Sequence, residues 1–94
     1  MAVELDHVYL LVSVGAPDAD RLAALGLTEG QPNRHPGLGT ACRRFFFTNA
    51  YLELLWVENP AEAQGEVARP LRLWERWSQR RQGTCPFGVV FRPG

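Results

Sequence analysis

The strands that this sequence predicts are apolar on both faces, and few helices are available to cover them. The first predicted strand, residues 2–14, has apolar side chains on both sides from position 8 onward, a pattern typical of a strand covered on both faces. One short helix is predicted early and another later. We therefore expect that the sheet closes on itself, or that its second face meets another copy or a missing half, because an exposed apolar face would aggregate.

The first part of the chain predicts a strand, a short helix and a loop. Strand alternation places five residues on one side of the first strand: Val3, Leu5, His7, Tyr9 and Leu11. A helix of about ten residues begins at Pro17, which suits the first helical turn, and ends at Gly26, which tolerates the left-handed conformation. Residues 27–40 are rich in glycine and proline. They predict a loop, either irregular throughout or with a short strand inside it.

Residues 41–57 predict a β-hairpin, in which ACRRFFF and YLELLWV are joined through Thr48-Asn49-Ala50. Its register stays open between two alternatives. A two-residue loop places Phe46 opposite Glu53, whereas a three-residue loop places Phe45 there. In either case one face of the second strand carries Tyr51, Glu53, Leu55 and Val57.

The last third of the chain predicts a connector, a helix and a final strand. Residues 58–68 are polar and alanine-rich, and they predict a loop or a short helix. A second helical stretch begins at Pro70 and ends at Gly83, with apolar side chains three and four residues apart along one face. Residues 86–92 then predict a short last strand.

Composition restricts the partners and the compartment. The ten basic residues, all arginine, balance ten acidic ones, which argues against nucleic acid and anionic membranes as partners. No apolar run approaches the roughly 20 residues of a membrane span, and residues 1–7 do not read as a signal peptide. We expect a cytoplasmic protein. In that compartment Cys42 and Cys85 are expected to be small buried residues rather than a disulfide.

Glu53 is the clearest anomaly in the sequence, because it is a carboxylate inside the apolar run LELLWV. A buried carboxylate must be ion-paired, protonated or bound to a metal. Three roles therefore stay open for Glu53. It pairs with Arg43 or Arg44 across the hairpin, it ligates a metal, or it acts as a catalytic general base whose apolar setting raises its pKa.

The other polar candidates each have a structural and a functional interpretation. His7 is either a hydrogen-bonded strand residue or a ligand or substrate contact, and Tyr9 either packs or contacts substrate. His35 is expected to be an exposed turn residue, with substrate gating by its loop as the alternative. Arg72 and Arg76 are either solvated or paired with Glu75 on a surface helix, or they clamp a carboxylate or phosphate.

The sequence resembles the glyoxalase-like group of the vicinal oxygen chelate (glyoxalase/bleomycin resistance/dioxygenase) superfamily. The resemblance is carried by LDHVYLLV, GAPDADRLAALGLTEG, HPGLGTACRRFFFTNAYLELLWV and RPLRLWERW, in this order. It implies an α+β fold, a βαβββ module with a cupped mixed sheet, followed by a C-terminal helix and the first strand of an incomplete second module. Residues 1–94 then form a single domain, an N-terminal half, with the module at 1–58 and the connector helix and final strand at 59–94.

The resemblance also implies a divalent metal site. His7 matches the ligand position on the first strand of a module and Glu53 the position on its last strand, and these residue types suit zinc, iron, manganese or nickel. In the second module the matching position is Phe87 or Gly88, neither of which ligates a metal. A symmetric homodimer that brings together two copies of His7 and of Glu53 would supply four ligands.

Three functions follow from the resemblance. The first is a divalent-metal-dependent enzyme of lyase, isomerase or dioxygenase type that acts on a small oxygen-chelating substrate. Its substrate contacts are expected at Tyr9, Arg44, Leu55 and Arg76, with Glu53 as the catalytic residue. The second is a metal-free module that binds a small molecule in an apolar pocket formed by the phenylalanines of RRFFF and Trp56. The third is a catalytically inactive half-domain that dimerises.

Overall fold

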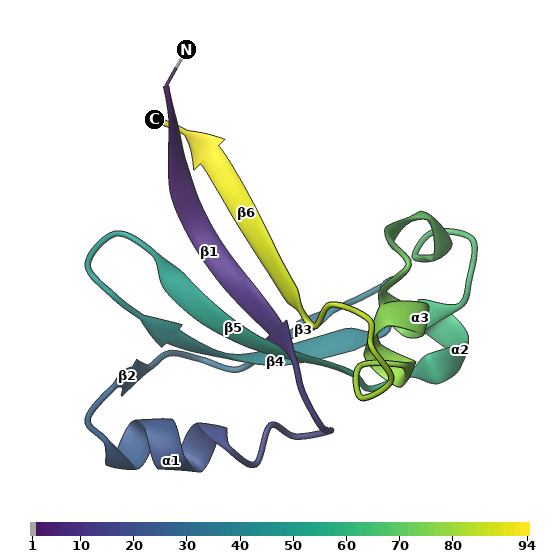
Figure 1. The fold of residues 1–94 in the computed structure, drawn as a ribbon, viewed down its shortest axis with the longest axis horizontal. Helices are drawn as coiled ribbons and strands as arrows, with labels where there is room; N and C mark the ends of the chain where they lie inside the picture. The colour runs from purple at the N-terminus through teal and green to yellow at the C-terminus, as the bar shows by residue number, and fades with distance from the viewer. Residues whose placement is uncertain (1) are drawn as a thin grey trace.

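The computed structural model describes residues 2–94, and within them six strands form one mixed sheet with short helices around it (Figure 1). In chain order the elements are β1 (Val3–Leu11), α1 (Ala19–Ala24), β2 (Thr28–Glu29), β3 (Asn33–His35), β4 (Thr40–Phe46), β5 (Tyr51–Val57), α2 (Pro60–Ala63), the 3-10 helix η1 (Arg69–Leu71), α3 (Leu73–Ser78) and β6 (Phe87–Pro93). The strand order is β2-β4-β5-β1-β6, and β3 also pairs with β4. The predicted α+β class is confirmed.

The first and last strands lie side by side at one edge of the sheet. Strand β1 runs parallel to β5 and antiparallel to β6. Figure 1 shows β1 and β6 extending together away from the β4–β5 hairpin, with α1 on one side of the sheet and α2 and α3 near its other end. The ends of the described chain meet there, because the Gly94 amide donates to the Ala2 carbonyl at 3.1 Å.

The β4–β5 hairpin adopts neither of the two predicted registers. Arg44 lies opposite Glu53, and Phe46 lies opposite Tyr51. The connection is longer than predicted and spans residues 47–50, where the Phe47 amide donates to the Ala50 carbonyl at 2.8 Å. This hydrogen bond joins the first and last residues of the loop, with the predicted turn residue Asn49 between them.

A bulge in β1 changes which residues share a face. The pairing with β6 shifts between Leu5 and His7, so that Leu5 lies opposite Phe91 and Val8 lies opposite Val89. Since alternate residues of β6 share a face, Leu5 points to the same side as Val8. The prediction that Leu5 and His7 share a face is therefore wrong, because strict alternation cannot anticipate a bulge.

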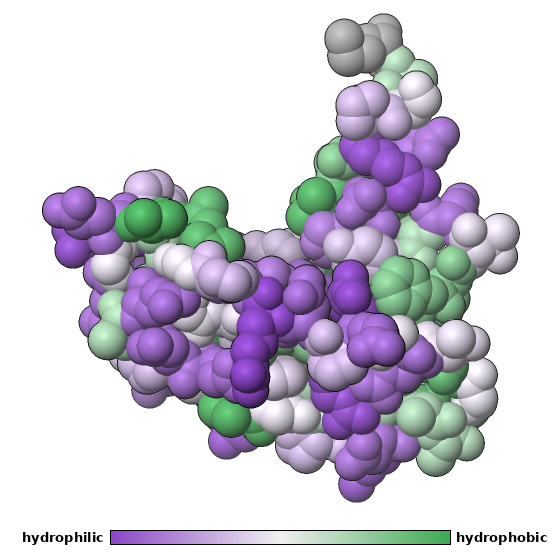
Figure 2. All heavy atoms as spheres, turned by 180° about the vertical axis from the view of Figure 1, so that it is seen from behind, coloured by the Kyte–Doolittle hydropathy of each residue, from purple (hydrophilic) through white to green (hydrophobic). Residues whose placement is uncertain are grey.

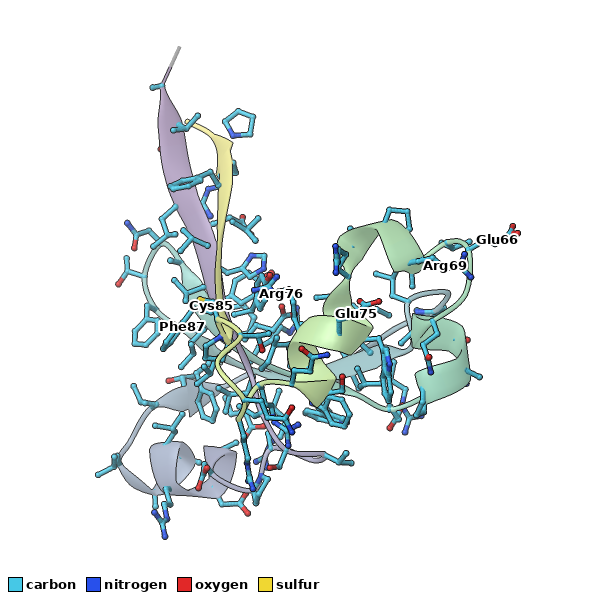
Figure 3. All side chains as sticks on the ribbon, turned by 45° about the vertical axis from the view of Figure 1, so that its right-hand side comes forward. Glu66, Arg69, Glu75, Arg76, Cys85 and Phe87 are labelled. Carbon is cyan, nitrogen blue, oxygen red and sulfur yellow. The ribbon has the colours of Figure 1, made fainter. Side chains whose placement is uncertain are left out.

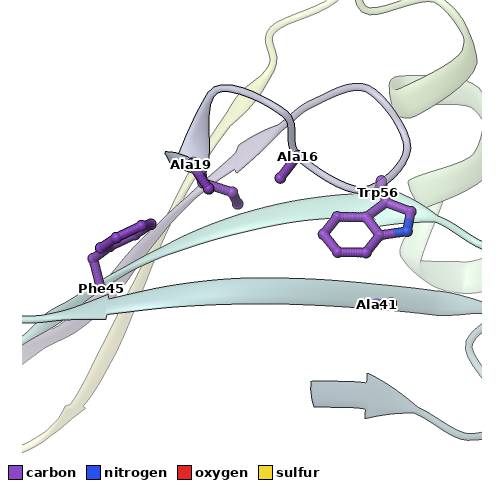
Figure 4. Packing of buried hydrophobic residues seen from close by; sticks show 6 residues of the cluster. Ala16, Ala19, Ala41, Phe45 and Trp56 are labelled. Carbon is purple, nitrogen blue, oxygen red and sulfur yellow. The ribbon is translucent and has the colours of Figure 1, made fainter. Parts of the chain in front are cut away.

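The core lies mainly under α1, on one face of the sheet. Figure 4 shows Ala16 and Ala19 lying over the hairpin strands, with Phe45 and Trp56 on either side of them. The buried cluster is completed by Ala41 and Leu54. A smaller cluster of Leu11, Cys42 and Leu55 lies on the opposite face. Phe45 and Trp56, which the sequence places in an apolar binding pocket, belong instead to the core under α1.

The helices are shorter than the sequence predicts. Helix α1 has six residues, and the Asp18 side chain makes no capping hydrogen bond. The stretch that begins near Pro70 is split, because Arg72 adopts the left-handed conformation at φ 57° between η1 and α3. None of the helices in residues 2–94 is long and apolar enough to cross a membrane. The predicted loop at 27–40 contains two short strands, β2 and β3, which both pair with β4.

Candidate functional site

The candidate site lies on the sheet face opposite α1, where β4, β5 and β1 run next to one another. The ladder pairs Tyr9 with Glu53 across β1 and β5, and pairs Arg44 with Glu53 across β5 and β4. His7 lies two residues before Tyr9 and therefore points to the same side. The structure thus brings His7 and Glu53, the two residues that the sequence singles out as ligands, to one face of the sheet.

Glu53 is buried between two histidines. Its side chain is 9% exposed, its Oε1 lies 3.7 Å from the Nε2 of His7, and its Oε2 lies 3.7 Å from the Nε2 of His35. Both separations exceed the length of a direct hydrogen bond. Each carboxylate oxygen therefore faces a different imidazole across a short gap.

The second ring nitrogen of each histidine already has a partner. The Nδ1 of His7 donates to Oδ2 of Asp6 at 2.6 Å, and the Nδ1 of His35 lies 2.9 Å from the Thr40 hydroxyl. The hydrogen bond from His7, followed by that from Arg92, lowers the pKa of Asp6. With Nδ1 bonded to the Asp6 carboxylate, the other ring nitrogen of His7, Nε2, faces Glu53.

No arginine in residues 2–94 forms an ion pair with Glu53. Arg43 instead bonds to Glu29 at 2.8 Å and to Asp20 at 2.9 Å, and its sequence neighbour Arg44 donates to the Gln31 carbonyl at 3.1 Å. The predicted pairing of Glu53 with Arg43 or Arg44 is therefore wrong. Arg43 points to the α1 face, where it donates to the Ala16 carbonyl. The Arg44 guanidinium lies over the rings of Phe46 and Tyr51.

The thiol of Cys42 lies beside the same carboxylate. Cys42 is buried, as the sequence predicts, whereas the prediction that Cys85 is also buried is wrong because Cys85 is exposed; both are free thiols. Burial, followed by the nearby charge of Glu53, raises the pKa of Cys42 to about 12. Ligand atoms of His35, Cys42 and Glu53 all lie within 4.8 Å of one another.

A cavity of about 400 Å³ opens onto Glu53 and the two histidines. It lies between the sheet and the η1–α3 segment, and its wall is formed by His7, Tyr9, His35, Leu38, Thr40, Tyr51, Glu53, Leu55, Leu71, Leu73 and Val90. The break at Arg72 allows Leu71 and Leu73 to face the same space, which residues two apart in one continuous helix do not do. Figure 2 shows the molecule from behind, hollowed between the projecting β1–β6 end and the rest of the chain.

The four predicted substrate contacts divide into two groups. Tyr9 and Leu55 line the cavity, whereas Arg44 and Arg76 do not. Figure 3 shows Arg76 reaching from α3 toward Cys85 and Phe87, and its guanidinium donates to the Phe87 carbonyl at 2.9 Å and to the Tyr9 hydroxyl. Arg76 therefore fixes the position of the Tyr9 side chain through its hydroxyl, without lining the cavity itself.

The glycine at position 88 on β6 leaves space for the Tyr9 ring. Gly88 lies opposite Tyr9 in the ladder, and a Cβ at this position would overlap the Tyr9 ring. The ring can therefore lie against the backbone of β6 only because residue 88 has no side chain.

The prediction that His35 is an exposed turn residue is wrong. Its side chain is only 25% exposed, and it is the last residue of β3, opposite Thr40. The loop that follows is fixed by Glu62, whose Oε1 accepts from the amides of Gly37 at 2.8 Å and Gly39 at 2.9 Å. The unusual length of the predicted loop was the one signal that pointed to this segment.

Comparison with known proteins identifies the family. A family model described as a glyoxalase-like domain matches residues 5–93. The chain belongs to the glyoxalase-like domain family. This family is part of the vicinal oxygen chelate superfamily, so the resemblance seen in the sequence is confirmed.

The fold of this glyoxalase-like domain is also found in a solved structure. A crystal structure of a hypothetical protein from Bacillus halodurans C-125 matches with a TM-score of 0.55 and 18% sequence identity. The match covers 82% of this chain and 53% of the other, so the chain spans about half the length of the protein that it matches. None of the curated proteins compared with the sequence matches it significantly.

The polar groups of the glyoxalase-like domain are of the types that bind a divalent cation. Imidazole nitrogen and carboxylate oxygen are accepted by zinc, iron, manganese and nickel. No arginine in residues 2–94 forms an ion pair with the buried Glu53 carboxylate, and both histidines have their second nitrogen engaged, as metal-ligating histidines do. The donor set therefore fits the kind of metal that the superfamily implies.

Proposed function

We propose that this glyoxalase-like domain binds a divalent cation through His7, His35 and Glu53 and receives a small oxygen-chelating molecule in the adjacent cavity. The observation that carries the proposal is the buried Glu53 carboxylate, which lacks an arginine partner in the described chain and faces an imidazole Nε2 at 3.7 Å on each side. A buried charge without compensation is strongly unfavourable, so a cation at this point would relieve it.

The spacing of the donor atoms supports a shared ion. Ligand atoms at 2.0–2.1 Å from a tetrahedral zinc lie about 3.4 Å apart. The 3.7 Å separations between Glu53 and each of the two histidines are close to this value. Three protein ligands leave a position open for substrate oxygens, which is the usual arrangement of a catalytic rather than a structural site.

The remaining side chains would bind and orient the substrate. A bound cation acts as a Lewis acid that polarises paired oxygens, the chemistry common to lyases, isomerases and dioxygenases of this kind. Tyr9 presents its ring at the cavity wall, and Arg76 fixes its hydroxyl. Leu55, Leu71 and Leu73 would keep water away from the reacting atoms. If Glu53 ligates the ion, its catalytic role is to hold that ion rather than to act as a free base.

Metal titration of the purified full chain tests the proposal. Calorimetry with zinc chloride and with manganese chloride should give about one ion per chain, with Glu53→Gln and His35→Gln each weakening binding at least tenfold. Glu58→Gln is the matched control, because Glu58 is an exposed carboxylate paired with Arg34 outside the cavity. Absence of binding by the unmodified chain, or equal losses in Glu53→Gln and Glu58→Gln, would overturn the proposal.

The same titration tests the homodimer expected from the sequence. If His7 and Glu53 of two copies share one ion, the stoichiometry is half an ion per chain and the mass in solution doubles when metal is added. A site completed by His35 within one chain gives one ion per chain at any oligomeric state. Light scattering during the titration separates the two arrangements.

A metal-free binding module is the second candidate function, favoured by the apolar part of the cavity wall. Leu38, Leu55 and Val90 line the cavity together with two leucines of the η1–α3 segment. Aliphatic side chains of this kind hold an apolar ligand without a metal. An apolar dye such as anilinonaphthalene sulfonate that binds with equal affinity before and after metal removal, in a chain that takes up no zinc, would favour this function.

A further inference from the structure

The thiol of Cys42 lies at the boundary between an apolar cluster and the polar group around Glu53. On one side Cys42 packs with Leu11 and Leu55. On the other side its sulfur comes within 4.8 Å of ligand atoms of both His35 and Glu53. Its neighbours on this side are an imidazole and a carboxylate, which bind the same divalent cations as a thiolate does.

The strand geometry directs the thiol toward the ion-binding group. Cys42 lies opposite Leu55 on β5, and Arg44, two residues further along β4, lies opposite Glu53. Cys42 and Glu53 therefore point to the same face of adjacent strands. Asn33, the partner of Cys42 on β3, is two residues before His35 on that strand. Three different strands thus bring Cys42, Glu53 and His35 together.

We propose that Cys42 is an additional ligand of the divalent cation, so that the site selects thiophilic ions such as zinc or cobalt over manganese. This inference rests on the proposed function, since it concerns the same ion. Thiolate sulfur favours zinc and disfavours the harder cations, which prefer oxygen. The thiol proton would be released to solvent as the sulfur–metal bond forms, and Cys42 would share the ion with His35 and Glu53, whose ligand atoms all lie within 4.8 Å of one another and of its sulfur.

Cobalt(II) is the probe that tests the role of Cys42 separately from the proposed metal binding by the histidines and Glu53. A thiolate bound to cobalt(II) gives an intense charge-transfer absorption in the near ultraviolet, whereas nitrogen and oxygen ligands give only weak visible bands. The chain contains two cysteines, Cys42 and the exposed Cys85. A charge-transfer band that is retained at full intensity in Cys85→Ser can therefore come only from Cys42.

The expected result is the charge-transfer band in the unmodified chain and in Cys85→Ser, and its loss in Cys42→Ser with weak visible bands remaining. The preference for zinc over manganese should fall at least tenfold in Cys42→Ser. Cobalt binding without the band in the unmodified chain overturns the role of Cys42 and leaves the His–Glu site intact. No cobalt binding at all overturns both proposals. If Cys42→Ser does not fold, the spectra of the unmodified chain and of Cys85→Ser still decide the question.

Discussion

The two halves of the sheet differ in how completely they are covered. In the β4–β5 half, every residue from Glu53 to Val57 is buried, and α1 packs over Phe45 and Trp56. In the β1–β6 half, alternate residues of β6 are exposed, including three large apolar ones: Phe87, Val89 and Phe91. The covered half positions the carboxylate of the candidate site, whereas the uncovered half supplies His7.

This difference gives the two candidate ligands, Glu53 and His7, different surroundings. Glu53 is fixed because its neighbours on β5 fill the core on the opposite face. His7 lies on β1 directly after the bulge and is held by Asp6 and by stacking on Tyr51 at 4.4 Å. We therefore expect changes in the covered half to cost stability, and changes in the uncovered half to affect the geometry around His7.

The largest expected effect comes from removing an aromatic ring in the covered half. Phe45→Ala should lower the free energy of unfolding by about 3–5 kcal/mol, because Phe45 is fully buried and its loss leaves a cavity. Phe91→Ala, the matched change in the uncovered half, should alter it by about 0.5 kcal/mol or less, because Phe91 is 62% exposed. Urea unfolding followed by tryptophan fluorescence measures both.

Equal losses of unfolding free energy in Phe45→Ala and Phe91→Ala would contradict the difference in coverage between the two halves of the sheet. They would mean that Phe91 is buried in solution, as the sequence-based expectation of a second copy or a missing half on the open face requires. Light scattering of the unmodified chain at the same concentrations would then show whether a second copy covers β6.

The sequence predicted the covered half better than the uncovered one. Periodicity was sufficient for β5, because strict alternation puts Glu53 and Leu55 on one face and the core residues on the other. It failed at the bulge near Leu5, which changes the face without leaving a signal in the hydrophobic pattern. It also failed for His35, whose burial depends on β3 pairing with a distant strand, a non-local contact that local turn residues do not encode.

The next expected effect concerns the carboxylate that orients His7. Asp6→Asn should weaken zinc binding by about 10–100-fold, as loss of the partner of a ligating histidine usually does. Thr40→Val removes the corresponding partner of His35 in the covered half. We expect a smaller loss there, because a neutral hydroxyl orients an imidazole less strongly than a carboxylate does. Calorimetry compares the two variants, and a larger loss in Thr40→Val would contradict the expected difference between the two partners.

The smallest expected effect is a pH dependence that Glu29 contributes in the covered half. Hydrogen bonds from Arg43 lower the pKa of Glu29 below its ordinary value of 4.5. A carboxyl group whose pKa is depressed in the folded state stabilises the fold above its unfolded pKa, and this contribution is lost as the pH falls through the folded pKa. The free energy of unfolding should therefore decrease on acidification below about pH 4.5, and Glu29→Gln should remove part of that decrease. The exposed Glu66 provides the control, since Glu66→Gln should leave the pH profile of urea unfolding unchanged. If the two variants give the same profile, the contact of Arg43 with Glu29 does not stabilise β2 on β4, and the packing of α1 alone distinguishes the covered half.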